Sequence, residues 1–116
     1  MGIDILPGEF YILSSVEKFK LGRSIAGFVH GRSSLARNGL NIHMAGFVDP
    51  GFEGNITLEV TNFTKRPIKL QKHMRVGQMV FMKTGMPVQT SYAEKKDSKY
   101  NHQSGPTLTK ISEDQK

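Results

Sequence analysis

Two carboxylates in the stretch AGFVDPGFEGNITLEV, residues 45–60, have the types and the spacing for acid–base chemistry. Asp49 opens a tight turn at Asp-Pro-Gly, and Glu59 follows ten residues later in a segment that alternates like a β-strand. The apolar residues of this segment, Ile56, Leu58 and Val60, share one face. Glu59 therefore lies on the other face. A carboxylate pair without neighbouring metal ligands indicates a general base that activates water. Two solvent-facing carboxylates are the simpler alternative, and the pair alone leaves both open.

A second candidate site is the stretch HGRSSLARNGL, residues 30–40, in which two arginines bracket two serines. Guanidinium groups and hydroxyls donate hydrogen bonds to phosphate oxygens. A turn here would direct Arg32 and Arg37 at one anion, with Ser33 and Ser34 between them. The stretch is not a Walker loop, because the required Gly-Lys-Ser/Thr ending is absent. A solvent-exposed, arginine-rich turn remains the alternative.

The composition argues against a protein-held metal. The chain has no cysteine, and its four histidines are scattered without the paired spacing of a zinc site: His30, His43, His73 and His102. We therefore expect no zinc and no other metal ligated by the protein. A Mg²⁺ ion held mainly by substrate phosphates leaves little mark on a sequence and stays compatible with this one.

The net charge of +6 is concentrated in one part of the chain. Between Glu59 and Glu94 there is no acidic residue, but there are six cations: Lys65, Arg66, Lys69, Lys72, Arg75 and Lys83. A solvated basic face, a polyphosphate ligand and nucleic acid all fit this excess. Nucleic acid is the least expected partner, because aromatic residues that could stack on bases are not interleaved with the cations.

Strands must position these residues, because the apolar periodicity is mostly two rather than 3.6. Strands are expected at 9–17, 24–34, 55–62, 66–72 and 76–83, and one helical turn at 35–40, ended by Gly39. Short strands separated by Gly, Pro and Asn predict an all-β sandwich or barrel. The segment 76–83 is apolar enough to be buried on both faces.

The 116 residues predict one domain followed by a polar tail from about residue 84. The tail is either disordered or a segment that orders over a bound anion. No apolar run approaches the length of a membrane span, and no leader is visible, so we expect a cytoplasmic protein without membrane contact.

Four motifs occur in one order along the chain: GRSSLARNGL, AGFVDPGFEGNITLEVTN, RVGQMVF and YAEKKDSKYNHQSGPT. Together they resemble the dCTP deaminase branch of the dUTPase superfamily over essentially the whole sequence. The resemblance implies an all-β, distorted dUTPase-like barrel (β-clip) with a short helical turn. It implies an N-terminally shortened core at 1–83 and a tail at 84–116 that closes over the ligand. It also implies a homotrimer with active sites between subunits.

The resemblance further implies zinc-independent deamination of dCTP to dUTP and ammonia. Glu59 would be the general base, helped by Ser33 and Arg37, which would hold the water and the glutamate. Asp49 would lie at the deoxyribose. The remaining implied contacts are Ala45 and Gln103 at the base, and Arg32, Ser34, Tyr92 and Lys99 at the phosphates.

Some members of this branch go on to cleave dUTP to dUMP and pyrophosphate, with Mg²⁺ on the triphosphate and the aspartate equivalent to Asp49 orienting a water. The Gly46-Phe47 pair before Val48-Asp49 is typical of such members. The sequence departs from the pattern of this family at two places: the segment before Pro7 is short, and the loop after His43 is shortened. A dUTPase without deaminase activity and a truncated, non-catalytic nucleotide-binding protein therefore remain alternatives.

Overall fold

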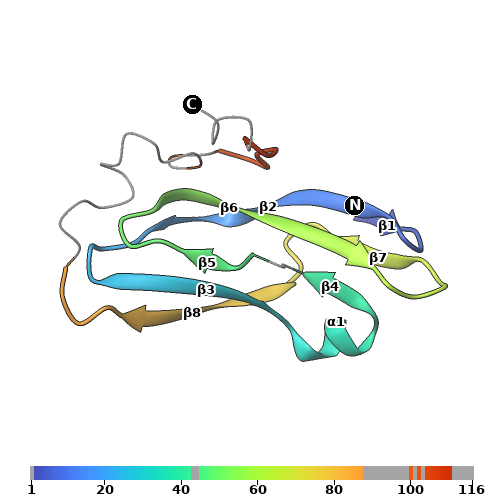
Figure 1. Cartoon of the computed structure of the whole chain (residues 1–116). Helices are drawn as coiled ribbons and strands as arrows, with labels where there is room; N and C mark the ends of the chain where they lie inside the picture. Colours follow the sequence, from blue (N-terminus) through green and yellow to red (C-terminus); the bar gives the residue numbers. More distant parts are fainter. Residues whose placement is uncertain (1, 43–44, 88–99, 101, 103, 111–116) are drawn as a thin grey trace.

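The computed structural model describes residues 2–42, 45–87, 100, 102 and 104–110 of the 116. The described part is built almost entirely of antiparallel strands, with one short helix (Figure 1). The strands are β1 (Gly2–Ile5), β2 (Phe10–Lys20), β3 (Ile25–Gly31), β4 (Leu40–Ile42), β5 (Phe47–Val48), β6 (Glu53–Asn62), β7 (Ile68–Gln71) and β8 (Gly77–Lys83). The helix α1 (Ser33–Arg37) lies between β3 and β4.

Three separate sheets result from the pairing of these strands. β1 pairs with β7, β2 and β4 flank β6, and β5 and β8 flank β3. In Figure 1 the long β2–β6 pair lies over the β3–β8 pair, with β4 and α1 at one end. The expected closed barrel is not present in the described residues, because β2 and β8 each keep one edge without a paired strand. The expected all-β architecture is confirmed, but the expectation of a closed barrel is wrong for the described residues.

The core lies between the two layers and is organised by β6. Ile56, Leu58 and Val60 point inward and are 6%, 8% and 0% exposed, as the alternation of the sequence predicts. Asn55 breaks the alternation. It is buried because β2 bulges between Ser14 and Lys18, and the Asn55 amide donates to backbone oxygens of that bulge.

The turn at Pro7-Gly8 forms as expected and introduces β2. Gly8 has φ +78°, and the Glu9 side chain accepts hydrogen bonds from the Leu6 N–H at 2.8 Å and the Tyr11 hydroxyl at 3.3 Å. The negative charge of Glu9, with smaller effects of burial and of this hydrogen bond, raises the pKa of Tyr11 above its ordinary value. The carboxylate therefore fixes the entry into β2.

The helical turn also ends where expected. The Gly39 N–H donates to the Ala36 carbonyl at 3.0 Å, and Gly39 has φ +90°, a left-handed conformation that favours glycine. The expectation for 76–83 was only half right. Met79 packs against the core, but Val80 and Met82 are 44% and 50% exposed, because nothing in the described chain covers the second face of β8. Phe81 shares the face of Met79 and is nevertheless 54% exposed.

Candidate active site

Glu59 lies in the middle strand of the β2–β6–β4 sheet, on the face away from the core. Its inward neighbours Leu58 and Val60 are buried, while Glu59 is half-buried on the opposite side. The cross-strand residue on β2 is Ile12, so an apolar side chain flanks the carboxylate. The arrangement leaves the Glu59 carboxylate partly sheltered from solvent.

Asp49 begins the turn that leads into β6, as expected. The Phe52 N–H donates to the Asp49 carbonyl at 3.1 Å, and Gly51 takes φ +85°. The turn is anchored to the segment after β2, because the Gly51 N–H donates to Gly22 and the Leu21 N–H to Phe52. β5 and β6 belong to different sheets, so Asp49 and Glu59 do not lie on the two strands of a hydrogen-bonded hairpin.

The arginine–serine turn forms α1 and its N-terminal approach. Arg32 occupies the position before the helix and is partly buried, whereas Ser33, Ser34 and Arg37 are exposed. The Arg32 guanidinium donates to the Arg75 carbonyl at 2.8 Å, which ties the turn to the loop between β7 and β8. The remaining N–H groups of the guanidinium still have the fork geometry for phosphate oxygens.

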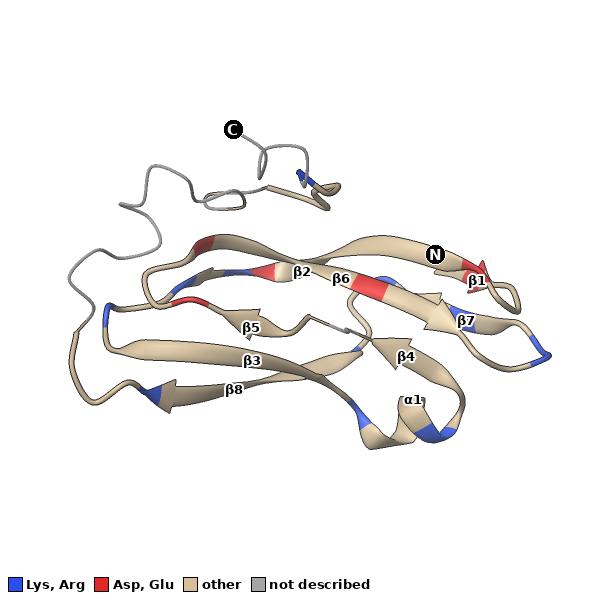
Figure 2. Cartoon of the chain, viewed as in Figure 1, with Lys and Arg blue, Asp and Glu red and all other residues tan. Residues whose placement is uncertain are grey.

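Within one chain, this turn and the Glu59 side chain lie on opposite faces of the β2–β6–β4 sheet. Leu35 of α1 belongs to the core cluster that contains Ile42 and Val60, so α1 covers the core side of the β4–β6 edge. The Glu59 side chain leaves from the other side. Figure 2 shows the basic positions beside α1 and the acidic positions in and before β6. Ser33 and Arg37 are thus not brought together with Glu59 on one face of this sheet.

The two remaining groups of expected contacts are only partly visible. Ala45 is exposed and precedes Gly46, whose carbonyl accepts the Val29 N–H at 2.8 Å and fixes this part of the loop on β3. Gly46 is required there, because a Cβ would lie 2.4 Å from the Val29 oxygen. The expected contacts at the base and the phosphates from the tail lie outside the described residues: Tyr92, Lys99 and Gln103.

The described part of the tail crosses β6. The His102 N–H donates to the Glu53 carbonyl, and the two side chains approach to 3.9 Å. Farther along, the Thr107 N–H donates to the Thr57 hydroxyl at 3.2 Å. Thr57 is two residues from Glu59 and on the same face. Sequence reasoning missed Thr57 and Arg75, because cross-strand and loop contacts leave no motif.

Of the described residues that are expected to act, none lines either of two cavities found in this part of the chain. The larger, of about 740 Å³, lies beside the loop after β7, and the smaller, of about 230 Å³, beside His102. Within the described part, no three acidic or histidine side chains gather to hold a metal, and no helix is long and apolar enough to cross a membrane.

The sequence model of the dCTP deaminase-like family matches residues 1–84. A protein of Methanosphaera stadtmanae named "dCTP deaminase, dUMP-forming" is 47% identical over 112 residues, which are 95% of this chain and 57% of that protein. A protein of the same name from Dictyoglomus turgidum is 45% identical over 109 residues, or 93% of this chain and 56% of that protein. The chain thus spans a little over half the length of these relatives.

Two solved structures share the fold. An EIAV dUTPase is 28% identical with a TM-score of 0.65, and the match covers 77% of this chain and 73% of that one. A Staphylococcus bacteriophage 80alpha dUTPase is 16% identical with a TM-score of 0.60, and the match covers 78% of this chain and 73% of that one. With a dUTPase-like fold and a family match over most of the described core, this chain belongs to the dCTP deaminase-like family.

Proposed function

We propose that this protein deaminates dCTP by hydrolysis, without zinc, and uses Glu59 as the general base. One observation carries the proposal: β6 sends its apolar residues into the core and Glu59 to the opposite face, which the tail crosses at Thr57. The name shared by the relatives, dCTP deaminase, dUMP-forming, supports dCTP as the substrate.

In the first step a water molecule attacks C4 of cytosine while Glu59 takes a proton from it. A C–O bond forms at C4, and the carboxyl passes this proton to N3. The carboxylate then takes the second proton, from the new C4 hydroxyl, and gives it to the amino group. The C–N bond breaks, ammonia leaves, and dUTP remains. Ile12, opposite Glu59 on β2, would keep bulk water from the carboxylate.

In the second step dUTP is hydrolysed to dUMP and pyrophosphate. Asp49 orients a second water toward the α-phosphorus, a P–O bond forms, and the bond to the β-phosphate oxygen breaks. The words dUMP-forming in the relatives' name support this step. Mg²⁺ would enter with the triphosphate as part of the substrate, because the described residues offer no cluster of three ligands for a resident ion.

The phosphates would be bound by Arg32 and Ser34. The hydrogen bond from Arg32 to the Arg75 carbonyl holds the guanidinium in place before the substrate arrives, which lowers the ordering cost of binding. Ala45 would border the cytosine from the loop on β3. Tyr92, Lys99 and Gln103 would complete the site when the tail closes over the nucleotide, a closure supported by the path of the described tail across β6.

A neighbouring copy would supply Ser33 and Arg37 to Glu59. The opposite placement of α1 and Glu59 within one chain supports a site shared between copies, and we propose a homotrimer. The outer face of the β5–β3–β8 sheet offers an apolar surface for contact between copies. Phe47, Phe28 and Val80 stand in one row across it, and the two phenyl rings meet at 5.1 Å.

The test is to incubate the 116-residue protein with dCTP and Mg²⁺ and to identify the products. Ammonia, dUMP and pyrophosphate are expected. Glu59→Gln should lower the rate of ammonia release by about 10²- to 10⁴-fold, because a neutral amide cannot take the proton, while dCTP affinity stays similar. Glu17→Gln, an exposed carboxylate of β2, is the matched control and should keep its activity.

Other product patterns contradict the proposal in distinct ways. Turnover of dUTP but not dCTP would make the protein a dUTPase. Binding of dCTP without turnover would support a non-catalytic nucleotide-binding protein. This alternative is favoured by the match to only 57% of the length of the Methanosphaera stadtmanae relative. Full deamination by the Glu59→Gln variant would remove Glu59 from the role of base.

A further inference from the structure

The described part of the tail is tied into a loop by contacts between its own ends. The Lys110 N–H donates to the Tyr100 hydroxyl at 3.1 Å, and the Lys110 ammonium lies 6.0 Å from the centre of the Tyr100 ring. These residues are ten apart yet in contact, so the chain reverses between them. Gly105, with φ +74°, lies within the reversal. Residues 100, 102 and 104–110 form what we call the tail loop.

The tail loop is held on the outer face of β6 at two points. The His102 N–H donates to the Glu53 carbonyl at one point, and the Thr107 N–H donates to the Thr57 hydroxyl at 3.2 Å at the other. In Figure 1 the loop, drawn orange-red, lies on the side of the β2–β6 pair that faces away from β3 and β8. Glu59 lies on this same face of β6.

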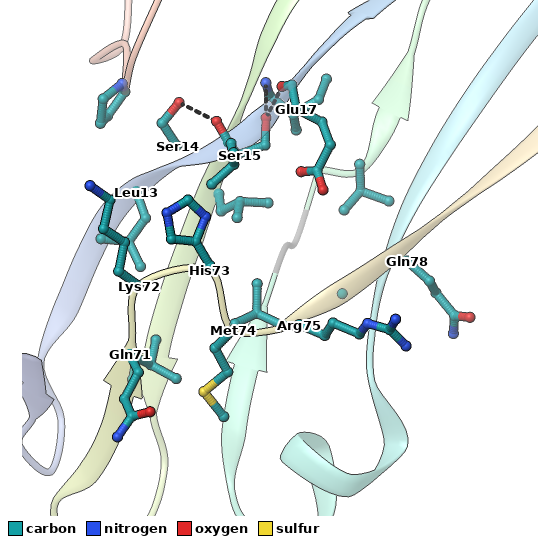
Figure 3. A pocket seen from close by; sticks show the side chains of 18 of the residues that line it. Leu13, Ser14, Ser15, Glu17, Gln71, Lys72, His73, Met74, Arg75 and Gln78 are labelled. Atoms are coloured by element: carbon teal, nitrogen blue, oxygen red, sulfur yellow. Dashed lines mark hydrogen bonds between the residues drawn. The ribbon is translucent and has the colours of Figure 1, made fainter. Parts of the chain in front are cut away.

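Of the two acceptors on β6, only Thr57 uses its side chain. A backbone carbonyl, as at Glu53, is present whatever the residue type, but a hydroxyl at position 57 requires Thr or Ser. The cross-strand neighbour Ser14 turns its own hydroxyl to the Ser15 carbonyl instead, at 3.2 Å (Figure 3). The second contact of the tail loop with β6 therefore depends on the identity of residue 57.

We propose that Thr57 is a positioning residue whose hydroxyl holds the tail loop beside Glu59 before the nucleotide arrives. The inference rests on the proposed function, in which Gln103 of the tail binds the base. Because Gln103 directly follows His102 in the chain, it can act only where the tail loop is held.

A positioning role predicts an effect on binding rather than on the chemical step. The apparent affinity for the nucleotide falls with the fraction of molecules whose tail loop is docked. Order that exists before binding lowers the cost of binding. Loss of one hydrogen bond changes such a docking equilibrium by about fivefold. Thr57 would therefore set KM for dCTP and leave kcat almost unchanged.

The first measurement needs no substrate and follows exchange of the Thr107 backbone N–H by NMR in the 116-residue protein. Thr57→Val replaces the hydroxyl with a methyl group of similar size and should speed this exchange about fivefold. Valine suits a strand as well as threonine does, so the fold should be kept. Thr57→Ser retains the hydroxyl and should restore the wild-type exchange rate.

Thr61→Val is the matched control. Thr61 also lies on the outer face of β6, two residues beyond Glu59, and it has no hydrogen bond to the described residues of the tail. The Thr61→Val variant should therefore leave exchange at Thr107 and the kinetics unchanged.

The second measurement is steady-state deamination of dCTP. Thr57→Val should raise KM about fivefold with kcat within twofold of the wild type, and Thr57→Ser should restore KM. Calorimetry with dCTP in the Glu59→Gln background should show the same fivefold loss of affinity, because that background removes the chemistry and leaves binding.

Unchanged Thr107 exchange in Thr57→Val would overturn the proposal, as would an equal effect of Thr61→Val. Faster exchange with unchanged KM and affinity would leave Thr57 a purely structural role, and a loss confined to kcat would place it in the reaction itself. A wild type that binds dCTP without turnover rejects only the proposed function, since exchange and calorimetry still report on Thr57. A wild type that does not bind dCTP rejects both.

Discussion

Among single residues, Asn62 has the clearest structural role. Its side chain is fully buried at the end of β6, and every polar group of the amide is used. The amide nitrogen donates to the carbonyls of Ile5 at 2.8 Å and Arg66 at 2.7 Å, and the amide oxygen accepts from the Thr64 N–H and hydroxyl. One side chain thus joins the end of β1, the end of β6 and the turn that follows.

Asn62→Ala should lower the free energy of unfolding by about 2–4 kcal/mol, because the Ile5 carbonyl, the Arg66 carbonyl and the Thr64 N–H each lose their hydrogen bond to this side chain. Urea denaturation followed by circular dichroism measures the change. Asn38→Ala, at an exposed position just after α1, should stay within about 0.5 kcal/mol of the wild type. Equal losses in the two variants would mean that the Asn62 network adds no specific stability.

Asp49 allows the two proposed hydrolytic steps to be separated. The turn that it opens uses its backbone carbonyl, which accepts the Phe52 N–H, so Asp49→Asn should preserve the turn. We expect pyrophosphate release to fall about 10- to 100-fold with little change in ammonia release, because only the second water depends on this carboxylate. The measurement is the accumulation of dUTP during dCTP turnover. An equal fall in both products would place Asp49 in nucleotide binding instead.

At the scale of elements, the close approach of Gly39 to Thr64 explains how α1 is joined to β6. A Cβ on Gly39 would lie 1.9 Å from the Thr64 Cγ2 atom, and Gly39 also has φ +90°. The Phe63 N–H donates to the Gly39 carbonyl at 2.9 Å, so the contact is fixed. The helix can therefore pack here only if residue 39 has no side chain.

Gly39→Ala should destabilise the protein by about 2–4 kcal/mol, from the clash and from the left-handed backbone together. Thr64→Ser removes the clashing methyl group and keeps the hydroxyl that bonds Asn62 and Arg66. In the Thr64→Ser background, the same glycine substitution should cost only about 1 kcal/mol, the backbone contribution. A double-mutant cycle measured by urea denaturation tests this, and additive effects would show that the methyl contact is unimportant.

The elements also mark how far sequence reasoning reaches. Strict alternation predicts β6 and its buried face, and Gly39 predicts the end of α1, because both signals are local. β4 and β5 were missed, since three and two residues are too few for a periodic pattern. β1 was also missed; it pairs with the distant β7. Alternation alone would put Asn55 on the outer face of β6, but it is buried, because the bulge of β2 that covers it depends on pairing between distant residues. Glu59 could be placed on the polar face of β6 from the pattern, whereas its proposed role in dCTP deamination came from the resemblance.

At the scale of the whole molecule, two kinds of apolar surface are exposed in the described part of the chain. The cavity of about 740 Å³ beside the loop after β7 is concave and lined by core residues. The outer face of the β5–β3–β8 sheet instead carries Phe47, Val80 and Met82, which are 55%, 44% and 50% exposed. Isolated exposed apolar residues are ordinary, but a row of them across three paired strands is typical of an interface.

We expect this outer face to join copies of the chain. Light scattering during size exclusion should give three times the chain mass of 13.0 kDa for the wild type. Val80→Glu combined with Met82→Glu should give the monomer mass, because each copy would bury charges without partners. Met86→Glu, at a residue that is 78% exposed in the turn after β8, is the control and should keep the wild-type mass.

If the double variant is a monomer, deamination should fall with it, since Ser33 and Arg37 would no longer meet a Glu59. A monomer that retains full deaminase activity would show that each site is complete within one chain, which contradicts the shared site.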